Sequence, residues 1–250
     1  MAKLLIIPDV HGIDSWKESV CEALLTNDVH IIFLGDYVDS FTIDTYKILD
    51  NLYEIIKLKK IYPDRITLLL GNHDYAYVFG KVAISGFNFV RWANYRQAFN
   101  DNWDLFDLAW GFQGQYKYTL ITHAGLTESF FREVVRDITD KKSVMYDVLI
   151  NETDISWIDM PLHTLLNYFK DQCGLMWQIG LERWGIYESG SIIWADRREL
   201  INDSFKGIDQ IVGHTALNSL EIVKTKNNDN LYFTDIHTDT NLTVFKINLE

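Results

Sequence analysis

Three short apolar runs, each followed at once by a polar cluster, constrain the fold of this chain more than any other feature. The runs are residues 4–7, 30–34 and 66–70. Continuous apolar runs of this length are typical of strands buried on both faces of a parallel sheet. Residues 15–25 and 42–61 separate the runs, and their apolar side chains recur at helical spacing. The alternation of strands and helices predicts a parallel sheet with right-handed crossovers.

The polar clusters supply oxygen and imidazole donors. Their members are Asp9 with His11, Asp36 with Asp39, and Asn72 with His73. In open α/β sheets the ligand site lies beyond the carboxyl ends of the strands, so we expect the three clusters to meet. Such donors suit divalent ions, of which manganese is expected first and iron, zinc, nickel and cobalt are alternatives. Two such ions, about 3.5–4 Å apart, would activate water for displacement at phosphorus.

The rest of the chain is interpreted as part of one domain covering residues 1–250. A mainly helical insertion is expected at about 127–185, and residues 77–108 also have a helical, aromatic-rich pattern. The pattern predicts further strands, the last of which would form an antiparallel meander with turns near 227–230 and 238–241. These strands are residues 116–122, 192–194, 208–212, 220–224, 231–234 and 242–247.

Charge and cysteine usage bound the partners and the compartment. The formal net charge of −12 weighs against binding of a long nucleic acid. Cys21 and Cys173 form no CxxC pair, which favours a reduced, cytoplasmic setting. The apolar run at 4–7 is too short for a signal peptide, and no stretch is long enough to span a membrane. We therefore expect an unprocessed, cytoplasmic protein without a membrane partner.

Five motifs occur in order at these strand ends. They are Asp9-Val10-His11-Gly12, Gly35-Asp36-Tyr37-Val38-Asp39, Gly71-Asn72-His73-Asp74, His123-Ala124-Gly125 and Gly213-His214-Thr215. Together they resemble the calcineurin-like metallophosphoesterase superfamily. Within it they are most similar to the phosphoprotein phosphatases, including bacterial, phage and diadenosine-tetraphosphatase-like members. The resemblance implies a four-layer α/β/β/α sandwich with two central mixed sheets.

The resemblance also implies a role for each motif residue. Asp9 and His11 would bind one metal, and Asp36 would bridge both. Asn72, His123 and His214 would bind the second, and Asn72 would also contact substrate. A metal-bridging hydroxide would attack phosphorus while His73 protonates the leaving oxygen. Asp39 would accept a hydrogen bond from His73 and hold the imidazole in its charged form.

The sequence departs from the family at the phosphate-binding residues. Phosphoprotein phosphatases have Arg-Gly after the second motif, and that arginine grips the phosphate, whereas Ser40 and Phe41 stand here. Asp74 replaces the usual glutamate, and Pro8 replaces a glycine or serine. A later segment around Trp194 resembles one that supplies a second phosphate-binding arginine, and either Arg197 or Arg198 would fill this role.

Structural interpretations compete with several of these roles. Asp9, Asp36 and Asp39 precede predicted helices, where aspartate is a favoured N-cap. His30 and His163 are expected to be structural, while His237 has a small chance of contacting substrate. The expected activity is phosphomonoester hydrolysis, with serine/threonine phosphoproteins as the family default. The alternatives are a hydrolase of diadenosine polyphosphates or cyclic nucleotides, and a non-catalytic metal-binding scaffold.

Overall fold

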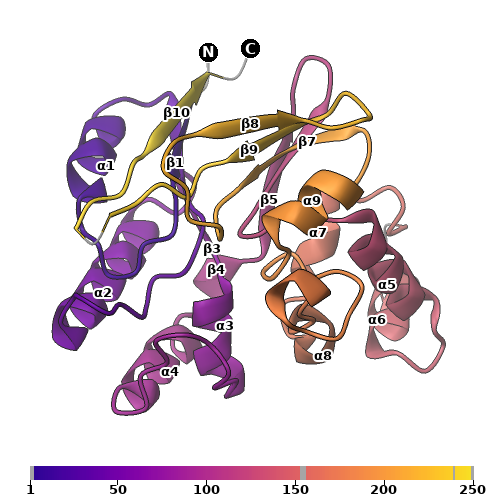
Figure 1. Ribbon diagram of the computed structural model, residues 1–250, viewed down its shortest axis with the longest axis horizontal. Coiled ribbons are helices and arrows are strands. Elements are labelled where there is room, and N and C mark those ends of the chain that lie inside the picture. Colours follow the sequence, from indigo (N-terminus) through magenta and orange to yellow (C-terminus); the bar gives the residue numbers. More distant parts are fainter. Residues whose placement is uncertain (1–2, 153–155, 239, 249–250) are drawn as a thin grey trace. The chain divides into compact units, whose positions relative to one another are not determined.

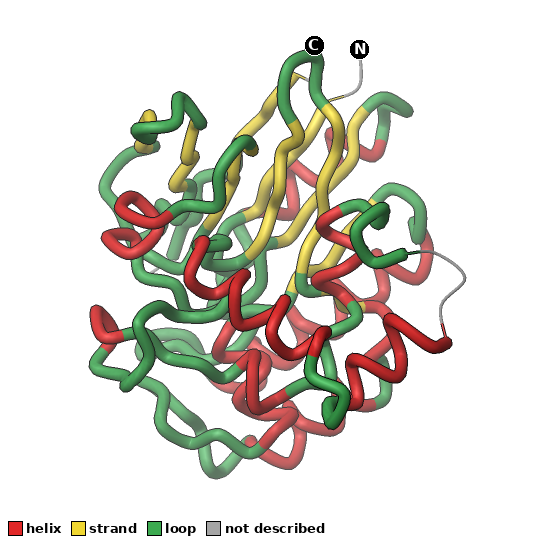
Figure 2. The backbone as a smooth tube through the Cα atoms, turned by 90° about the vertical axis from the view of Figure 1, so that its right-hand side faces the viewer, coloured by secondary structure: helices red, strands yellow, loops and turns green. Residues whose placement is uncertain are grey.

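The computed structural model describes residues 3–152, 156–238 and 240–248, and the chain divides into two compact units. The first unit comprises Met1–Asp107, Val212–Glu221 and Tyr232–Glu250, and the second comprises Leu108–Ile211 and Ile222–Leu231. Two five-stranded sheets are present, and each mixes parallel with antiparallel pairs (strands yellow in Figure 2). The predicted mixed α/β class with two mixed sheets is therefore confirmed.

The first unit contains the sheet that the three apolar runs predict, in the order β10-β1-β2-β3-β4. Strands β1, β2, β3 and β4 are parallel, and β10 is antiparallel to β1. The elements of this unit are β1 (Lys3–Ile7), α1 (Trp16–Leu24), β2 (Val29–Phe33), α2 (Thr45–Ile61), β3 (Ile66–Leu69), α3 (Asn72–Phe79), α4 (Trp92–Asn100), η1 (Trp103–Leu105), β4 (Phe106–Asp107) and β10 (Phe245–Asn248).

Helices α1 and α2 pack against this sheet, and Figure 1 shows α1 above α2. Helix α2 buries Ile48, Leu52 and Ile55, which lie on one face at helical spacing. It begins three residues later than predicted, because the carboxylate of Asp44 caps it by accepting the Tyr46 N–H at 2.9 Å. All four residues of β3 are buried, as expected for a strand covered on both faces.

The predicted helical segment at 77–108 is only partly helical. Helix α3 ends at Gly80, whose left-handed backbone (φ 66°) closes the last turn, and α4 begins at Trp92. The residues between them form a loop without helix or strand. The chain then forms the short strand β4. The segment predicted to be helical therefore also contains a loop and a strand.

The sheet β5-β6-β7-β9-β8 lies mainly in the second unit, as do most of the remaining helices, while Val212, Glu221, Tyr232 and Phe233 of its strands belong to the first unit. The helical segments of the second unit include those of the predicted insertion around 127–185, of which 153–155 lie outside the described residues. Its elements are β5 (Ala109–Gln113), β6 (Tyr118–Thr122), α5 (Glu128–Thr139), α6 (Val144–Tyr146), the π-helical η2 (Asp147–Glu152), α7 (Leu162–Asn167), α8 (Cys173–Met176), η3 (Leu181–Arg183), α9 (Arg197–Asp203), β7 (Ile208–Val212), β8 (Glu221–Lys224) and β9 (Asn230–Phe233).

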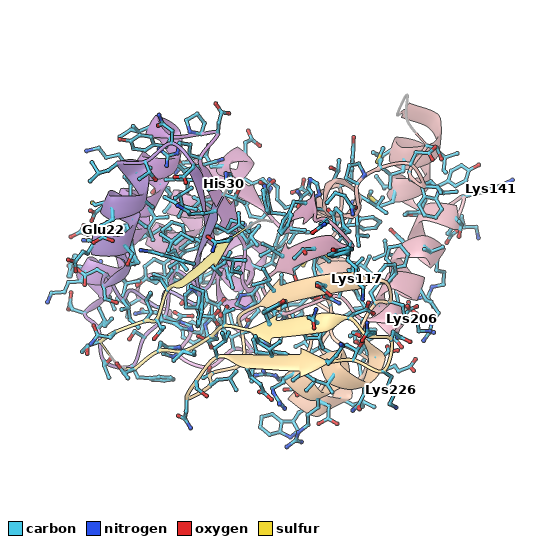
Figure 3. The ribbon with its side chains drawn as sticks, turned by 90° about the horizontal axis from the view of Figure 1, so that it is seen from above. Glu22, His30, Lys117, Lys141, Lys206 and Lys226 are labelled. Carbon is cyan, nitrogen blue, oxygen red and sulfur yellow. The ribbon has the colours of Figure 1, made fainter. Side chains whose placement is uncertain are left out.

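Lysines gather at one end of this second sheet. Figure 3 shows Lys117, Lys206 and Lys226 near one another there. The ammonium group of Lys117 pairs with the buried carboxylate of Asp229, 2.5 Å away, in the turn that joins β8 to β9. The turn is closed by a hydrogen bond from the Thr225 N–H to the carbonyl of Asp229, close to the predicted position of a hairpin.

Two strand predictions were wrong. Residues 192–194 form a turn in which the N–H groups of Trp194 and Ala195 both donate to the Ser191 carbonyl. The last strand, β10, does not continue a meander beside β9, because it crosses to the other sheet and pairs with β1. For residues 192–194 the apolar pattern predicted burial correctly, whereas the residues of β10 are only half-buried or exposed, and in neither place did the pattern predict the hydrogen-bond partners.

No helix among the described residues is long and apolar enough to cross a membrane. Among the described residues, neither Cys21 nor Cys173 forms a disulfide.

Candidate active site

The loops after β1, β2 and β3 bring the predicted residues together within the first unit. Several of them have a backbone conformation that non-glycine residues rarely adopt. Of the six described non-glycine residues with positive φ, four are predicted site residues: His11 (42°), Asp36 (48°), Asp39 (65°) and His214 (65°). Each costs on the order of 1 kcal/mol or more, and such strain concentrates at functional sites.

Asp9, His11 and Asp36 form a cluster that fits a metal ion. One donor atom from each lies within 4.8 Å of the others. The Nδ1–H of His11 donates to the carbonyls of Val38 and Asp39, at 3.0 and 2.9 Å. The Nε2 lone pair is therefore left for coordination, and it lies 3.8 Å from Oδ2 of Asp36. Two acceptors that face each other at this distance suit a cation between them.

The electrostatics of the cluster agree with this interpretation. Burial raises the pKa of Asp36 well above its ordinary value, and the neighbouring charge of Asp9 raises it further. A divalent cation would stabilise both carboxylates in their charged form. Burial lowers the pKa of His11, which favours the neutral imidazole that binds metals. The donor set and its electrostatics therefore fit the divalent ions expected from the sequence.

Backbone N–H groups hold the carboxylates in place. The His73 N–H donates to Oδ1 of Asp36 at 2.9 Å, and the His214 N–H donates to Oδ1 of Asp9 at 3.0 Å. Each of these histidines follows a motif glycine by one or two residues. A Cβ on Gly71 would overlap Oδ1 of Asp36, and a Cβ on Gly213 would overlap Oδ1 of Asp9. Glycine therefore allows each carboxylate to approach the backbone closely.

His73 and Asp39 form a hydrogen-bonded pair beside this cluster. Nδ1 of His73 lies 2.8 Å from Oδ2 of Asp39. The other oxygen of Asp39 accepts the hydroxyl proton of Tyr77, and the Tyr77 oxygen accepts the N–H of Asn88 at 2.7 Å. The Asn88 bond fixes the direction of the hydroxyl, so Tyr77 is the donor to Asp39. Sequence analysis missed Tyr77, although its position four residues after His73 places both on one helix face.

Burial opposes the expected effect of Asp39 on His73. Desolvation is the largest influence and lowers the pKa of His73, while the Asp39 hydrogen bond raises it only in part. Burial therefore counteracts the expected effect of Asp39 on the charge of the imidazole, and the role of Asp39 stays a prediction. The neighbouring ring of His11, edge-on at 5.1 Å, is a second influence that disfavours a charge on His73.

A pocket of about 190 Å³ lies next to this pair. His11, Asp39 and His73 line one part of it, and Phe41 and His237 line another. Nδ1 of His237 donates to Asp235 at 2.8 Å. The imidazole of His237 lies 5.9 Å from that of His11, so this histidine borders the site more closely than the sequence suggested.

The remaining predicted residues are distributed over both units. Asn72 is buried at the start of α3 in the first unit. His123 follows β6 in the second unit and is fully buried. Arg197 and Arg198 begin α9, also in the second unit. The guanidinium of Arg198 pairs with Glu182 at 3.2 Å and is 75% exposed, whereas Arg197 is partly buried.

Helix caps and strand contacts bear on the structural roles considered for the aspartates and for His30. Ser15 and Asp44 occupy the N-cap positions of α1 and α2, so Asp9, Asp36 and Asp39 are not caps of these helices. His30 lies on β2 (labelled in Figure 3), where its Nε2 is 2.9 Å from the hydroxyl of Thr67.

Known proteins resemble this chain in sequence and fold. The model of the calcineurin-like phosphoesterase family matches residues 2–215. A cold-active protein-tyrosine phosphatase of the psychrophile Shewanella sp. is similar over 94% of this chain and 71% of its own, at 13% identity and a TM-score of 0.50. A protein serine/threonine phosphatase from Saccharomyces cerevisiae is similar over 94% and 67%, at 14% identity and a TM-score of 0.46. At 13% identity, the similarity to the Shewanella protein supports the fold alone. With a TM-score of 0.46, the similarity to the yeast protein is too weak to support a conclusion.

Proposed function

Since this chain belongs to the calcineurin-like phosphoesterase family and is therefore a metal-dependent hydrolase, we propose that it hydrolyses phosphomonoesters at a site with two divalent ions. The observation that carries this proposal is the hydrogen-bonded pair of His73 and Asp39 next to the cluster of Asp9, His11 and Asp36. Metal ions bound by this cluster would supply an electrophilic site, and the neighbouring hydrogen-bonded imidazole would supply a proton donor.

Six residues would hold the ions. Asp9 and His11 would bind the first, Asp36 would bridge, and the second would take Asn72, His123 and His214. The motifs that contain these residues lie within the matched range 2–215, which supports the assignment. When bound, a pair of divalent ions would make water a stronger nucleophile and stabilise the charge on the phosphoryl oxygens. Manganese is the ion we propose first.

His73 would donate a proton to the leaving group, and Asp39 would orient His73. Water adds to phosphorus, the ester P–O bond breaks, and the leaving oxygen takes a proton from His73. The products are an alcohol and inorganic phosphate. Asp39 would keep the His73 ring oriented through Nδ1, so that Nε2 serves as the donor. A substrate dianion beside His73 would raise its pKa and so counteract the effect of burial.

Arg197 is the better candidate for contact with the phosphate. Arg198 is largely exposed whereas Arg197 is partly buried, so Arg197 is the less solvated of the two. Ser40 stands where related phosphatases carry an arginine, so the chain would grip phosphate with fewer cations. Phosphoserine or phosphothreonine in proteins is the first substrate class to test, and nucleotide substrates are the second.

The test measures the release of inorganic phosphate from phenyl phosphate, whose alcohol is a poorer leaving group than 4-nitrophenol, with added Mn²⁺. We expect activity in the unaltered chain, a loss of about 100-fold or more in Asp36→Asn and in His73→Asn, and no loss in Asp50→Asn. Asp50 is exposed on α2, so this control makes the same chemical change away from the site. An unaltered chain that is inert with Mn, Fe, Zn, Ni and Co would contradict the proposal. Two fully active site variants would contradict the residue roles.

A further inference from the structure

The pocket next to His73 carries information about the substrate. We propose that this pocket receives the leaving group, and that the leaving group is an uncharged aromatic alcohol that rests on Phe41. The inference rests on the proposed function, because it takes His73 as the residue that protonates the leaving oxygen. It favours an aromatic alcohol over the serine or threonine of the family default, a choice that the family assignment leaves open.

The position of the pocket relative to the acid pair supports this role. His73 and Asp39 both line it, so a group bound there lies beside the proposed proton donor. Nδ1 of His73 is engaged by Asp39 at 2.8 Å, and Nε2 is the ring nitrogen that remains. A substrate whose phosphorus lies at the metal cluster would therefore place its ester oxygen near His73 and the rest of its alcohol in this pocket.

Phe41 provides an aromatic surface in the pocket that the fold does not use. It is 85% exposed, although it follows Asp39 by only two residues. A Cβ on Gly86 would lie 3.5 Å from the Phe41 ring and 3.6 Å from Cβ of Asp39. The space next to the ring stays open because Gly86, with φ of 73°, has no side chain. A ligand ring could stack there and gain the preference of aromatic pairs for each other.

The size of the pocket limits the leaving group. Its volume is about 190 Å³. A dry cavity of about 150 Å³ holds one benzene ring, and pockets for drug-sized ligands begin at about 300 Å³. One substituted ring fits the pocket.

The charge of the pocket wall points the same way. None of the described residues that line it is lysine or arginine. Ser40, Thr42, Ser85 and Thr238 contribute hydroxyl groups, and the carboxylate of Asp39 is the acidic group. The leaving group of a dinucleoside polyphosphate carries several negative charges, and the described lining offers no lysine or arginine to pair with them. A neutral alcohol, by contrast, needs only hydrogen bonds and apolar contact.

The experiment compares three substrates in the full chain with Mn²⁺: phenyl phosphate, ethyl phosphate and diadenosine tetraphosphate. Phe41→Ala removes the ring and Phe41→Tyr retains it. Tyr116→Ala is the matched control, because Tyr116 is equally exposed (85%) and does not line the pocket. Comparing each variant with the unaltered chain on the same substrate cancels the intrinsic reactivity of that substrate.

We expect Phe41→Ala to lower kcat/KM for phenyl phosphate about fivefold to tenfold and to change ethyl phosphate by less than about twofold. Phe41→Tyr and Tyr116→Ala should retain the activity of the unaltered chain on both. Equal losses on phenyl and ethyl phosphate would overturn the inference, as would faster hydrolysis of diadenosine tetraphosphate than of phenyl phosphate. An unaltered chain inert on all three would instead contradict the proposed function, so the two failures are distinguishable.

Discussion

Replacing Tyr77 with phenylalanine removes one hydrogen bond to Asp39, the residue that orients the proposed acid His73. The hydroxyl of Tyr77 donates to Oδ1 of Asp39, and the Asn88 N–H holds the hydroxyl oxygen in place. Tyr77 and Asp39 are both buried, so water cannot readily replace the lost donor. Burial also raises the pKa of Tyr77 well above its usual range, which keeps the hydroxyl protonated and able to donate.

The magnitude follows from the charge on the acceptor. A hydrogen bond to an ionised group contributes about 1.5–3 kcal/mol, so we expect Tyr77→Phe to lower the free energy of unfolding by about that amount. Asp39 retains its bond to His73, so catalysis should be weakened and not abolished. General acids contribute about 100-fold to 10,000-fold, and partial misplacement of His73 should cost about tenfold in kcat.

The assay measures kcat and KM for phosphomonoesters whose alcohols span a wide range of acidity. A poor leaving group needs the proton of His73 and should lose about tenfold in kcat, whereas 4-nitrophenol leaves unaided and should lose less than about twofold. KM should change little. Tyr95→Phe is the matched control, because the Tyr95 hydroxyl is also buried but donates only a long bond of 3.5 Å to the Thr45 carbonyl.

A uniform loss across all leaving groups would refute the reasoning, because it would show that Tyr77 supports the fold and not the proton donor. The double variant with Asp39→Asn provides a second check. If Tyr77 acts through Asp39, adding Tyr77→Phe to Asp39→Asn should cost almost nothing further in kcat. Additive losses would place the effect of Tyr77 elsewhere.

Three further perturbations test the site and the fold. Gly71→Ala puts a methyl group onto Oδ1 of Asp36, so we expect it to abolish activity and to lower the free energy of unfolding, measured in urea, by about 1–3 kcal/mol. The control is Gly174→Ala, where no atom lies within 4 Å of the new methyl group, and this variant should be neutral or slightly stabilising. Removing divalent ions with a chelator should abolish activity and lower the thermal midpoint, and re-addition of Mn²⁺ should restore both in the unaltered chain but not in Asp36→Asn. Burial lowers the pKa of His30 below its ordinary 6.5, and the charge of Lys59 adds to this effect. As the pH drops through 6.5, His30 is protonated in the unfolded chain before it is protonated in the folded chain, so the free energy of unfolding should fall. His30→Gln should flatten that part of the profile, and an unchanged slope of unfolding free energy between pH 7.5 and 5.5 would show that His30 does not contribute.

Local patterns predicted the first sheet because its strands have a simple requirement. Strands β1, β2 and β3 are covered on both faces, so their residues are continuously apolar and easy to find. Each ends at a polar motif, and parallel pairing brings those ends to one edge. Asp9, Asp36 and their neighbours could thus be assigned to one site before any distance was known.

Pairing partners were harder to predict because apolar periodicity reports burial and not hydrogen bonding. Residues 192–194 are buried yet form a turn, and β10 pairs with β1 across a separation of about the whole chain. The loop between α3 and α4 was missed because its aromatic side chains pack against one another, as Phe87 and Phe89 do with ring centroids 4.9 Å apart. Contacts between residues distant in sequence leave no local signal.

The sequence by itself determined the chemistry of the site: oxygen and imidazole donors at successive strand ends, glycines beside them, and a serine where the family resemblance implies an arginine. Only the tertiary structure decided which atoms meet. It placed Tyr77 behind Asp39, oriented His11 so that Nε2 is left for a metal, and put the ring of Phe41 beside a pocket without lysine or arginine. The physical reason is that donor chemistry belongs to each side chain, whereas distance and desolvation arise only when loops from different strands are packed together.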